Sequence, residues 1–179
     1  TIKQMDVGLD TGDMLATEEV PLLGTETGES LFEQLSTLGG PLLLKTLEEI
    51  ENGEAEPVKQ NDEESTYAKM LTREMGELDF KEEAVRLERY VRGLNSWPSA
   101  YTHYHGKLLK IWEADVVEKD SEGRPGEIVE LQKDGFLIQT GKGCLKARQV
   151  QLEGKKRMPA GDFLRGMQMK EGDLLGCEE

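Results

Sequence analysis

Residues 127–152, EIVELQKDGFLIQTGKGCLKARQVQL, decide the fold of this 179-residue chain. Runs of β-branched and apolar residues alternate there with Asp134-Gly135 and Gly141-Lys142-Gly143, which are typical of tight turns, so the pattern predicts three short strands. Two more runs upstream, Ala100–His105 and Leu108–Val117, repeat the pattern. Five strands at this regular spacing predict a small Greek-key β-barrel.

Helical spacing flanks the predicted strands. Apolar residues recur every three or four positions from Ala84 to Leu94, so Lys81–Leu94 is predicted to be an amphipathic helix. After the last strand, Pro159–Met167 is predicted to form a short closing helix with Phe163 facing inward.

The first third of the chain follows a different pattern. Residues 5–14, MDVGLDTGDM, are dense in Gly and Asp and predict a loop, and Met14–Val20 predicts a strand. We expect two helices next. The first has Thr27 as its N-cap, and the second runs from Pro41 to Asn52-Gly53, a typical helix C-terminus.

A linker divides the chain. Residues 54–65, EAEPVKQNDEES, contain too few apolar residues to order themselves firmly. The sequence therefore predicts an α+β protein in which residues 1–53 form a strand plus two helices, residues 54–66 a linker, and residues 67–179 the β-barrel with its flanking helix.

Charge is unevenly distributed along the chain. The net charge is −14, but residues 1–72 account for −12 of it and residues 73–179 for only −2. The stretch Lys142–Lys170 holds eight basic residues against two acidic ones. Because salt screens charges beyond about 8 Å, a local basic surface can bind phosphate even on an acidic chain.

Composition argues against several other classes of protein. No apolar stretch reaches the roughly 20 residues that span a bilayer, and no targeting leader is apparent, so we expect a cytoplasmic protein with no membrane partner. Because the first residue is not Met, the chain is expected to begin within a longer protein or to be processed.

Cys144 and Cys177 lack CxxC spacing and are expected to be incidental thiols. His103 and His105 share a face of a predicted strand, but no third ligand completes a site, so no metal is expected.

Five segments match one family in order and spacing, over about Lys3 to Gly166. Residues 5–14 and the strand after them resemble the folate-dependent formyltransferases. Four later segments resemble the carboxy-terminal domain of methionyl-tRNA formyltransferases: MGELDF (75–80), RLERYVRGLNSWP (86–98), KIWEA (110–114) and EGKKRMPAGDFLRG (153–166). The resemblance implies that residues 1–53 end a Rossmann-like formyltransferase catalytic domain. It also implies that residues 67–179 form an OB-like domain that binds the inside of the tRNA bend.

The resemblance also implies a reaction. The family transfers a formyl group from 10-formyltetrahydrofolate to the amino group of methionine on initiator tRNA, using an Asn, a His and the Asp of an LDTG turn, which is Asp10 here. A carboxylate can hold the His protonated and order water for proton transfer. By resemblance, Asp6, Val7, Gly8 and Leu9 line the pterin pocket. The family's Asn and His would precede the first residue, so the chain alone is expected to be inactive.

The initiator tRNA is the expected macromolecular partner, and the full-length protein is expected to be a monomer. Trp97 and Trp112 lie in segments that read as core, so we expect them to pack inside and not to stack on bases. The candidate tRNA contacts are basic residues of the barrel, with two arginines of the helix as second rank: Lys142, Lys146, Arg148, Lys155, Lys156 and Arg157, then Arg89 and Arg92.

Two other functions stay open. One is a free-standing nucleic-acid-binding module without chemistry, because a Greek-key barrel with a basic face is a familiar nucleic-acid scaffold. The other is a formyltransferase that acts on an amino sugar nucleotide, since that family shares the LDTG turn. The segments at residues 86–98 and 153–158 favour tRNA.

Overall fold

The computed structural model describes residues 1–119 and 121–176, so Cys177 lies outside the described part of the chain. The chain divides into two compact units, unit 1 (Thr1–Met70) and unit 2 (Leu71–Glu179), and each is described by itself. No helix within the described residues is both long and apolar enough to cross a bilayer.

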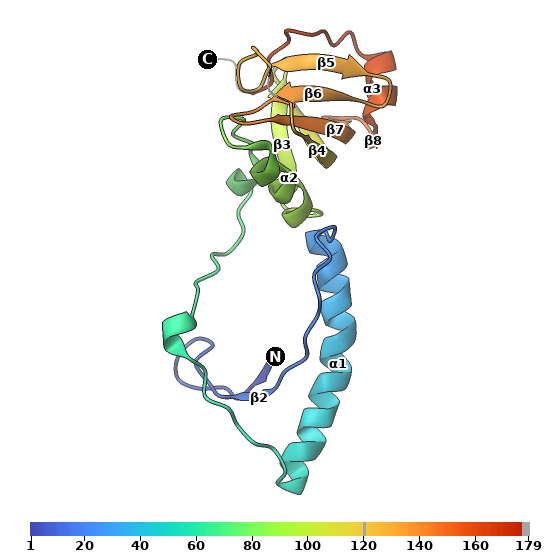
Figure 1. The fold of residues 1–179 in the computed structure, drawn as a ribbon. Coiled ribbons are helices and arrows are strands. Elements are labelled where there is room, and N and C mark those ends of the chain that lie inside the picture. The colour runs from blue at the N-terminus through green and yellow to red at the C-terminus, as the bar shows by residue number, and fades with distance from the viewer. Residues whose placement is uncertain (120, 177–179) are drawn as a thin grey trace. The chain divides into compact units, whose positions relative to one another are not determined.

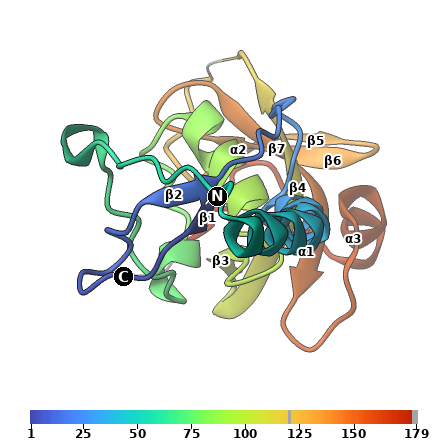
Figure 2. The same ribbon diagram turned by 90° about the horizontal axis from the view of Figure 1, so that it is seen from below.

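Unit 1 begins with a short antiparallel pair of strands. Strand β1 (Ile2–Lys3) pairs with β2 (Met14–Ala16), and Figure 2 shows the two side by side. Strand β2 is shorter than the predicted Met14–Val20. On its other side, Met14 and Val58 exchange two backbone hydrogen bonds of 2.8 Å. A three-residue 3-10 helix, Asp62–Glu64, follows in the segment expected to be a linker.

A single long helix dominates unit 1 (Figure 1). Helix α1 (Gly28–Asn52) begins with a capping box between Thr27 and Ser30 and ends at Gly53, whose φ of 74° is left-handed. The prediction of two helices was wrong, because α1 continues through Pro41. The proline removes one backbone donor, but the preceding residue is Gly40, which has no Cβ to clash with the proline ring.

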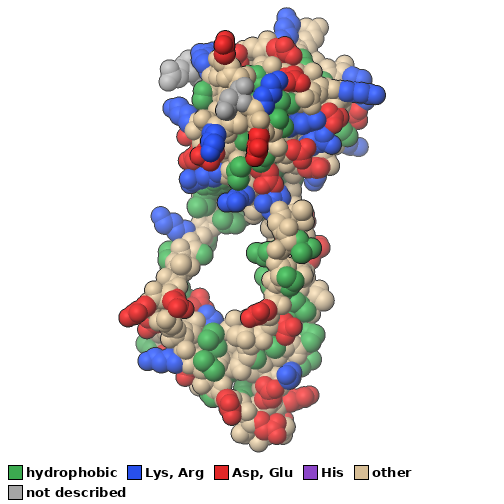
Figure 3. Space-filling model, in the orientation of Figure 1, with side chains coloured by type: hydrophobic (Ala, Val, Ile, Leu, Met, Phe, Trp, Pro, Cys, Tyr) green, Lys and Arg blue, Asp and Glu red, His purple; other side chains and the backbone are tan. Residues whose placement is uncertain are grey.

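The apolar stripe of α1 is largely exposed within unit 1. Figure 3 shows hydrophobic side chains on the visible face of this unit. The exposed large apolar residues on the helix are Phe32, Leu35, Leu43, Leu44, Leu47 and Ile50.

Unit 2 contains all five predicted strands in one antiparallel sheet. Its order, β3-β4-β7-β6-β5, places three consecutive hairpin strands beside β4, which is the Greek-key arrangement. A short strand, β8, pairs with β7 and was not predicted. The strands are β3 (Ala100–Tyr104), β4 (Lys107–Val117), β5 (Ile128–Gln132), β6 (Gly135–Gln139), β7 (Cys144–Leu152) and β8 (Met158–Pro159).

The α+β class is confirmed, but the strands do not close into a barrel. In the described residues no ladder joins β3 to β5. A non-strand segment, residues 172–176, lies between them: it exchanges backbone hydrogen bonds with Gly126 and Ile128 at the start of β5, and the Gly176 N–H donates to His103 O at 3.0 Å. This segment satisfies edge groups that a barrel would pair strand to strand.

Two helices cover the sheet. Helix α2 (Ala84–Gly93) buries Ala84, Leu87 and Val91, as its spacing predicted. Helix α3 (Ala160–Gly166) buries Phe163 and lies beside β6 and β7 (Figure 1). A three-residue 3-10 helix, Glu74–Gly76, precedes α2. The largest fully buried strand side chains are Leu109, Ile111, Ile128, Phe136, Leu137, Ile138, Leu145 and Val150.

Two predictions about individual side chains in unit 2 were wrong. His105 does not share a strand face with His103, because His105 and Gly106, with φ of 48° and 71°, form the tight turn between β3 and β4. Trp97 is not packed inside but 55% exposed. Trp112 is only half-buried, because the β4–β7 register shifts around it and such a bulge re-aims a side chain.

Candidate functional site

The loop of unit 1 carries Asp10 on an exposed turn. Asp10 has a φ of 59°, in the left-handed region that Asp adopts more readily than most residues. Its carboxylate lies 3.2 Å from Lys3 Nζ, and its side chain is 76% exposed. Asp10 is therefore presented to solvent with one cationic neighbour, as an acceptor that can receive a further donor.

The loop around Asp10 is held by contacts to its backbone. Gln60 Nε2 donates to Asp10 O and to Gly12 O, both at 2.7 Å. A Cβ at Gly12 would stand 1.8 Å from Gln4 O, so only glycine allows this close approach. These contacts fix the turn that displays Asp10.

The residues expected at the pterin pocket form an open surface. Val7 and Leu9 are fully or nearly fully exposed, and the Asp6 carboxylate accepts from the Val7 N–H at 2.7 Å. Exposed apolar side chains beside backbone polar groups suit one face of a flat heterocycle. Residues 6–9 therefore fit one wall of such a site.

The candidate tRNA contacts of unit 2 do not form one continuous basic face. Lys142 precedes β7 and its carbonyl accepts from the Ala84 N–H, whereas Lys155, Lys156 and Arg157 follow β7. A nine-residue strand separates them by about 30 Å. Figure 3 shows acidic side chains interspersed with basic ones on the visible face of this unit.

The middle of β7 is neutralised by carboxylates. Lys146 Nζ lies 2.9 Å from Asp134 Oδ1 and is only 13% exposed. Arg148 also contacts Asp134 and lies 3.5 Å from Asp115 Oδ2. The hydrogen bond from Lys146 and the charges of both cations lower the pKa of Asp134, so this carboxylate is ionised at neutral pH. Lys146 and Arg148 thus already have anionic partners.

The two candidate arginines of α2, Arg89 and Arg92, differ in whether a carboxylate neutralises them. Arg92 is paired with Glu88 one turn earlier. Arg89 is exposed, and no carboxylate oxygen in the described chain lies within 4.0 Å of it. Of this pair, Arg89 is the one available to a ligand.

The residues 153–157, which we call the basic turn, keep their charges exposed. Lys155, Lys156 and Arg157 are all exposed, and none forms an ion pair with a described carboxylate. The turn is anchored by the Lys155 N–H, which donates to Leu152 O at 2.9 Å. It is the densest unpaired positive charge among the candidates.

Sequence reasoning missed the surface that supports the basic turn. Lys110 and Trp112 of β4 lie under it, with Gln149 and Gln151 of the neighbouring strand β7. The only sequence signal was the alternation of KIWEA, in which Lys110 and Trp112 fall on one face.

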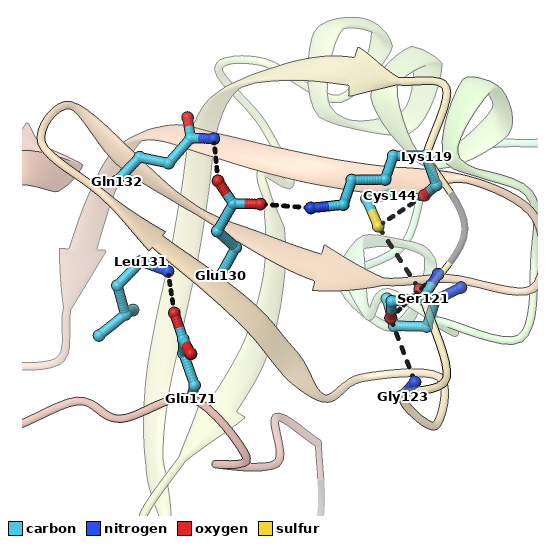
Figure 4. Close-up of polar contacts among 9 residues, drawn as sticks. Lys119, Ser121, Gly123, Glu130, Leu131, Gln132, Cys144 and Glu171 are labelled. Carbon is cyan, nitrogen blue, oxygen red and sulfur yellow. Dashed lines mark hydrogen bonds and ion pairs between the residues drawn. The ribbon is translucent and has the colours of Figure 1, made fainter.

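A further polar cluster in unit 2 is structural. Figure 4 shows the Lys119 ammonium directed at Glu130 and the buried Cys144 thiol directed at the Lys119 carbonyl. Lys119 Nζ lies 2.6 Å from Glu130 Oε2, and the thiol donates to Lys119 O at 3.0 Å. The hydrogen bond and charge of Glu130 raise the pKa of Lys119. Leu131 N–H donates to Glu171 in the same view. These contacts tie the β4–β5 connection to the sheet and leave Cys144 inaccessible.

Comparisons with known proteins extend these observations. Residues 70–168 match the family described as "Formyl transferase, C-terminal domain". A methionyl-tRNA formyltransferase of Lachnospira eligens is 53% identical over 181 residues, covering 98% of this chain and 58% of the relative. One from Agathobacter rectalis is 48% identical, covering 98% of this chain and 56% of the relative. The chain therefore spans a little over half the length of these curated relatives.

Solved structures share the fold at lower identity. HypX from Aquifex aeolicus in complex with tetrahydrofolic acid has a TM-score of 0.63 at 21% identity, covering 99% of this chain and 33% of that chain. An N-formyltransferase from Helicobacter canadensis, in complex with folinic acid and dTDP-3-aminofucose, has a TM-score of 0.58 at 20% identity, covering 81% of this chain and 53% of that chain. At these identities the likeness concerns the fold alone.

Proposed function

The chain belongs to the formyl transferase family, whose C-terminal domain it carries at residues 70–168, and from that premise we propose that it takes part in methionyl-tRNA formylation. In the proposed reaction, a formyl group passes from 10-formyltetrahydrofolate to the α-amino group of methionine on initiator tRNA. The observation that carries the proposal is 53% identity to a methionyl-tRNA formyltransferase across 98% of the chain.

The proposed domain roles follow the division of the sequence into a first part with a loop, a strand and helices, and a later part that is rich in strands. Residues 1–53 end the catalytic domain, residues 54–66 link it, and residues 67–179 bind tRNA. A reaction on aminoacyl-tRNA implies a cytoplasmic protein, and we assign the full-length protein as a monomer.

Asp10 has one proposed chemical role. An amine that attacks a formyl carbon forms a tetrahedral oxyanion and must lose a proton. The exposed Asp10 carboxylate suits the task of holding a protonated imidazole and ordering water nearby. The histidines of the sequence are His103 and His105, both in unit 2, so we assign neither to this task. Residues 6–9 would hold the pterin of the formyl donor, which supplies the activated carbon.

The basic turn is the leading proposed tRNA contact. Lys155, Lys156 and Arg157 are exposed, and no carboxylate of the described residues pairs with them, which suits phosphate binding. Lys142 and Arg89 are proposed as secondary contacts. Lys146, Arg148 and Arg92 are assigned a lesser role, because each already neutralises a carboxylate.

A binding experiment tests the tRNA assignment. The chain is titrated with initiator methionyl-tRNA at increasing salt, beside a variant in which Lys155, Lys156 and Arg157 become alanine. We expect the variant to bind more weakly and to reduce the slope of log affinity against log salt by about two to three. The control replaces Arg124, Lys133 and Lys170, which are exposed elsewhere in unit 2.

Four outcomes test the proposal and its alternatives. Equal losses in both triple variants would remove the basic turn from the proposal. Tight binding of a dTDP-linked amino sugar with no tRNA binding would favour the sugar nucleotide reaction. Turnover by this chain alone would contradict the expectation that Asp10 needs partners outside it, whereas RNA binding without preference for initiator tRNA would favour a general nucleic-acid module.

A further inference from the structure

Two cations converge on one tryptophan ring in unit 2. Lys110 Nζ lies 5.3 Å and Arg157 Cζ 5.0 Å from the centroid of the Trp112 ring. Within the described residues, no carboxylate oxygen lies within 4.0 Å of either cation. Like charges held together repel each other, and the ring quadrupole offsets only part of this cost. The arrangement therefore favours a bound anion.

Two cations further along β7, by contrast, do have a carboxylate partner. Lys146 and Arg148, on the same strand as Gln149 and Gln151, are both neutralised by Asp134. The acid nearest the ring in sequence, Glu113, accepts from Gln149 Nε2 at 2.6 Å instead. No described carboxylate therefore neutralises Lys110 or Arg157, although Lys146 and Arg148 on β7 are neutralised.

Hydrogen bonds hold the ring and the basic turn in one geometry. Trp112 Nε1 donates to Gln151 Oε1 at 3.1 Å, and Gln151 Nε2 donates to Lys155 O at 3.0 Å. Arg157 Nε donates to Gln149 Oε1 at 2.7 Å. The side chains of two strands therefore fix the turn before any ligand arrives, which lowers the ordering entropy lost on binding.

Among the residues that the structure describes, both cations keep donors without a partner. Arg157 uses only its Nε in these contacts, so its two terminal nitrogens are left for a bidentate interaction with phosphate oxygens. Lys110 Nζ makes one long contact, 3.4 Å from Ser99 Oγ. A phosphate that both cations reach would receive donors from β4 and from the basic turn.

We propose that Lys110, Trp112 and Arg157 form a phosphate-binding cradle for the RNA backbone. Lys110 and Arg157 contact the phosphate, and Trp112, Gln149 and Gln151 are positioning residues. The cradle rests on the proposed tRNA binding and extends it to Lys110, a residue outside the basic stretch of the sequence. It predicts that RNA lies across β4 and β7 and not only against the basic turn.

Binding of initiator tRNA and of an unrelated RNA hairpin, each measured over a salt series, tests the cradle. Lys110→Ala is compared with Lys133→Ala, which removes the same charge from the exposed turn between β5 and β6. We expect Lys110→Ala to weaken tRNA binding by about three- to tenfold and to lower the salt slope by about one, with Lys133→Ala unchanged.

Variants of Trp112 test the positioning role. Trp112→Leu should weaken binding about as much as Lys110→Ala but leave the salt slope unchanged, because every charge remains. Trp112→Phe keeps a ring for the cations and should restore most of the affinity. Thermal unfolding of both variants separates loss of binding from loss of fold, and Trp112→Phe keeps the test decisive if Trp112→Leu is unstable.

The outcomes separate the cradle from the function on which it rests. Wild-type binding with Lys110→Ala and Lys133→Ala indistinguishable would overturn the cradle and leave tRNA binding standing. A Trp112→Phe variant as weak as Trp112→Leu would remove the positioning role of the ring. A wild-type chain that binds neither RNA would overturn both proposals.

Discussion

The Tyr104 hydroxyl donates a 2.8 Å hydrogen bond to Asp173 Oδ2, which joins the end of β3 to a segment 69 residues later. The Lys170 N–H donates to the same oxygen at 2.9 Å. Asp173 belongs to the segment, residues 172–176, that bridges β3 and β5 where the sheet does not close. Tyr104 and Asp173 therefore hold together the two edges of the sheet.

The ionisation of both groups is shifted by this contact. Burial, and then the hydrogen bond and charge of Asp173, raise the pKa of Tyr104 to about 12. Burial alone would raise the pKa of Asp173, but the hydrogen bonds from Lys170 and Tyr104, with the nearby charges of His105 and Lys170, lower it. The stabilisation from neutral Tyr104 is complete below about pH 10 and is lost as pH rises toward 12; that from ionised Asp173 is lost as pH falls below about 4.

Replacing Tyr104 with Phe is expected to lower the free energy of unfolding by about 1.5 kcal/mol at pH 7, because a hydrogen bond to a carboxylate is lost. The difference from wild type should shrink between about pH 10 and 12. Urea unfolding followed by tryptophan fluorescence measures it, since Trp97 and Trp112 both lie in unit 2. Tyr67→Phe, at an exposed position of unit 1, is the control. A pH-independent difference would contradict the coupling.

Replacing Asp134 with Asn is expected to strengthen tRNA binding by about threefold at low salt and to steepen the salt dependence, because Lys146 and Arg148 lose their shared carboxylate. Filter binding over a salt series measures both quantities. Asp162→Asn, which frees Arg165 on α3, is the matched control. If both variants gain equally, only net charge matters and the middle of β7 does not contact RNA.

Replacing Gln60 with Ala is expected to loosen the Asp10 turn, because two hydrogen bonds of 2.7 Å to its backbone are lost. Amide hydrogen exchange of the peptide covering residues 4–14 should accelerate by about tenfold, while peptides of unit 2 stay unchanged. Lys59→Ala, at the neighbouring exposed position, should leave exchange at the wild-type rate. Unchanged exchange in the Gln60 variant would show that β1 and β2 hold the turn without it.

Local patterns predicted most elements because they carry their own signals. The turns at Asp134-Gly135 and Gly141-Lys142-Gly143 bound β6, an apolar strand that is buried along its whole length, and the spacing of Leu87 and Val91 placed one face of α2 in the core. The same local reasoning failed at Pro41, where one helix continues through a proline that follows a glycine. It failed again at His105, whose turn geometry outweighs its place in an alternating run.

The sequence predicted which residues belong to the candidate sites, but not how those residues lie relative to their neighbours in space. Asp10 and the basic turn were identified by motif, and both remain proposals. No local signal indicated that Asp134 neutralises Lys146 and Arg148, since the three meet only when β6 and β7 pair. Lys110 lay outside the basic stretch, so the contact that it shares with Arg157 on the Trp112 ring could not be read from composition.

The sequence by itself determined the five main strands of unit 2 and their order along the chain, the buried face of α2 and the family, because periodicity, turn chemistry and motifs act within short stretches of chain. Only the tertiary structure decided which cations pair with a carboxylate, how residues 172–176 bridge the open sheet, and where Trp112 points. Those properties depend on distances between residues far apart in the chain, and electrostatic pairing and burial follow such distances and not sequence separation.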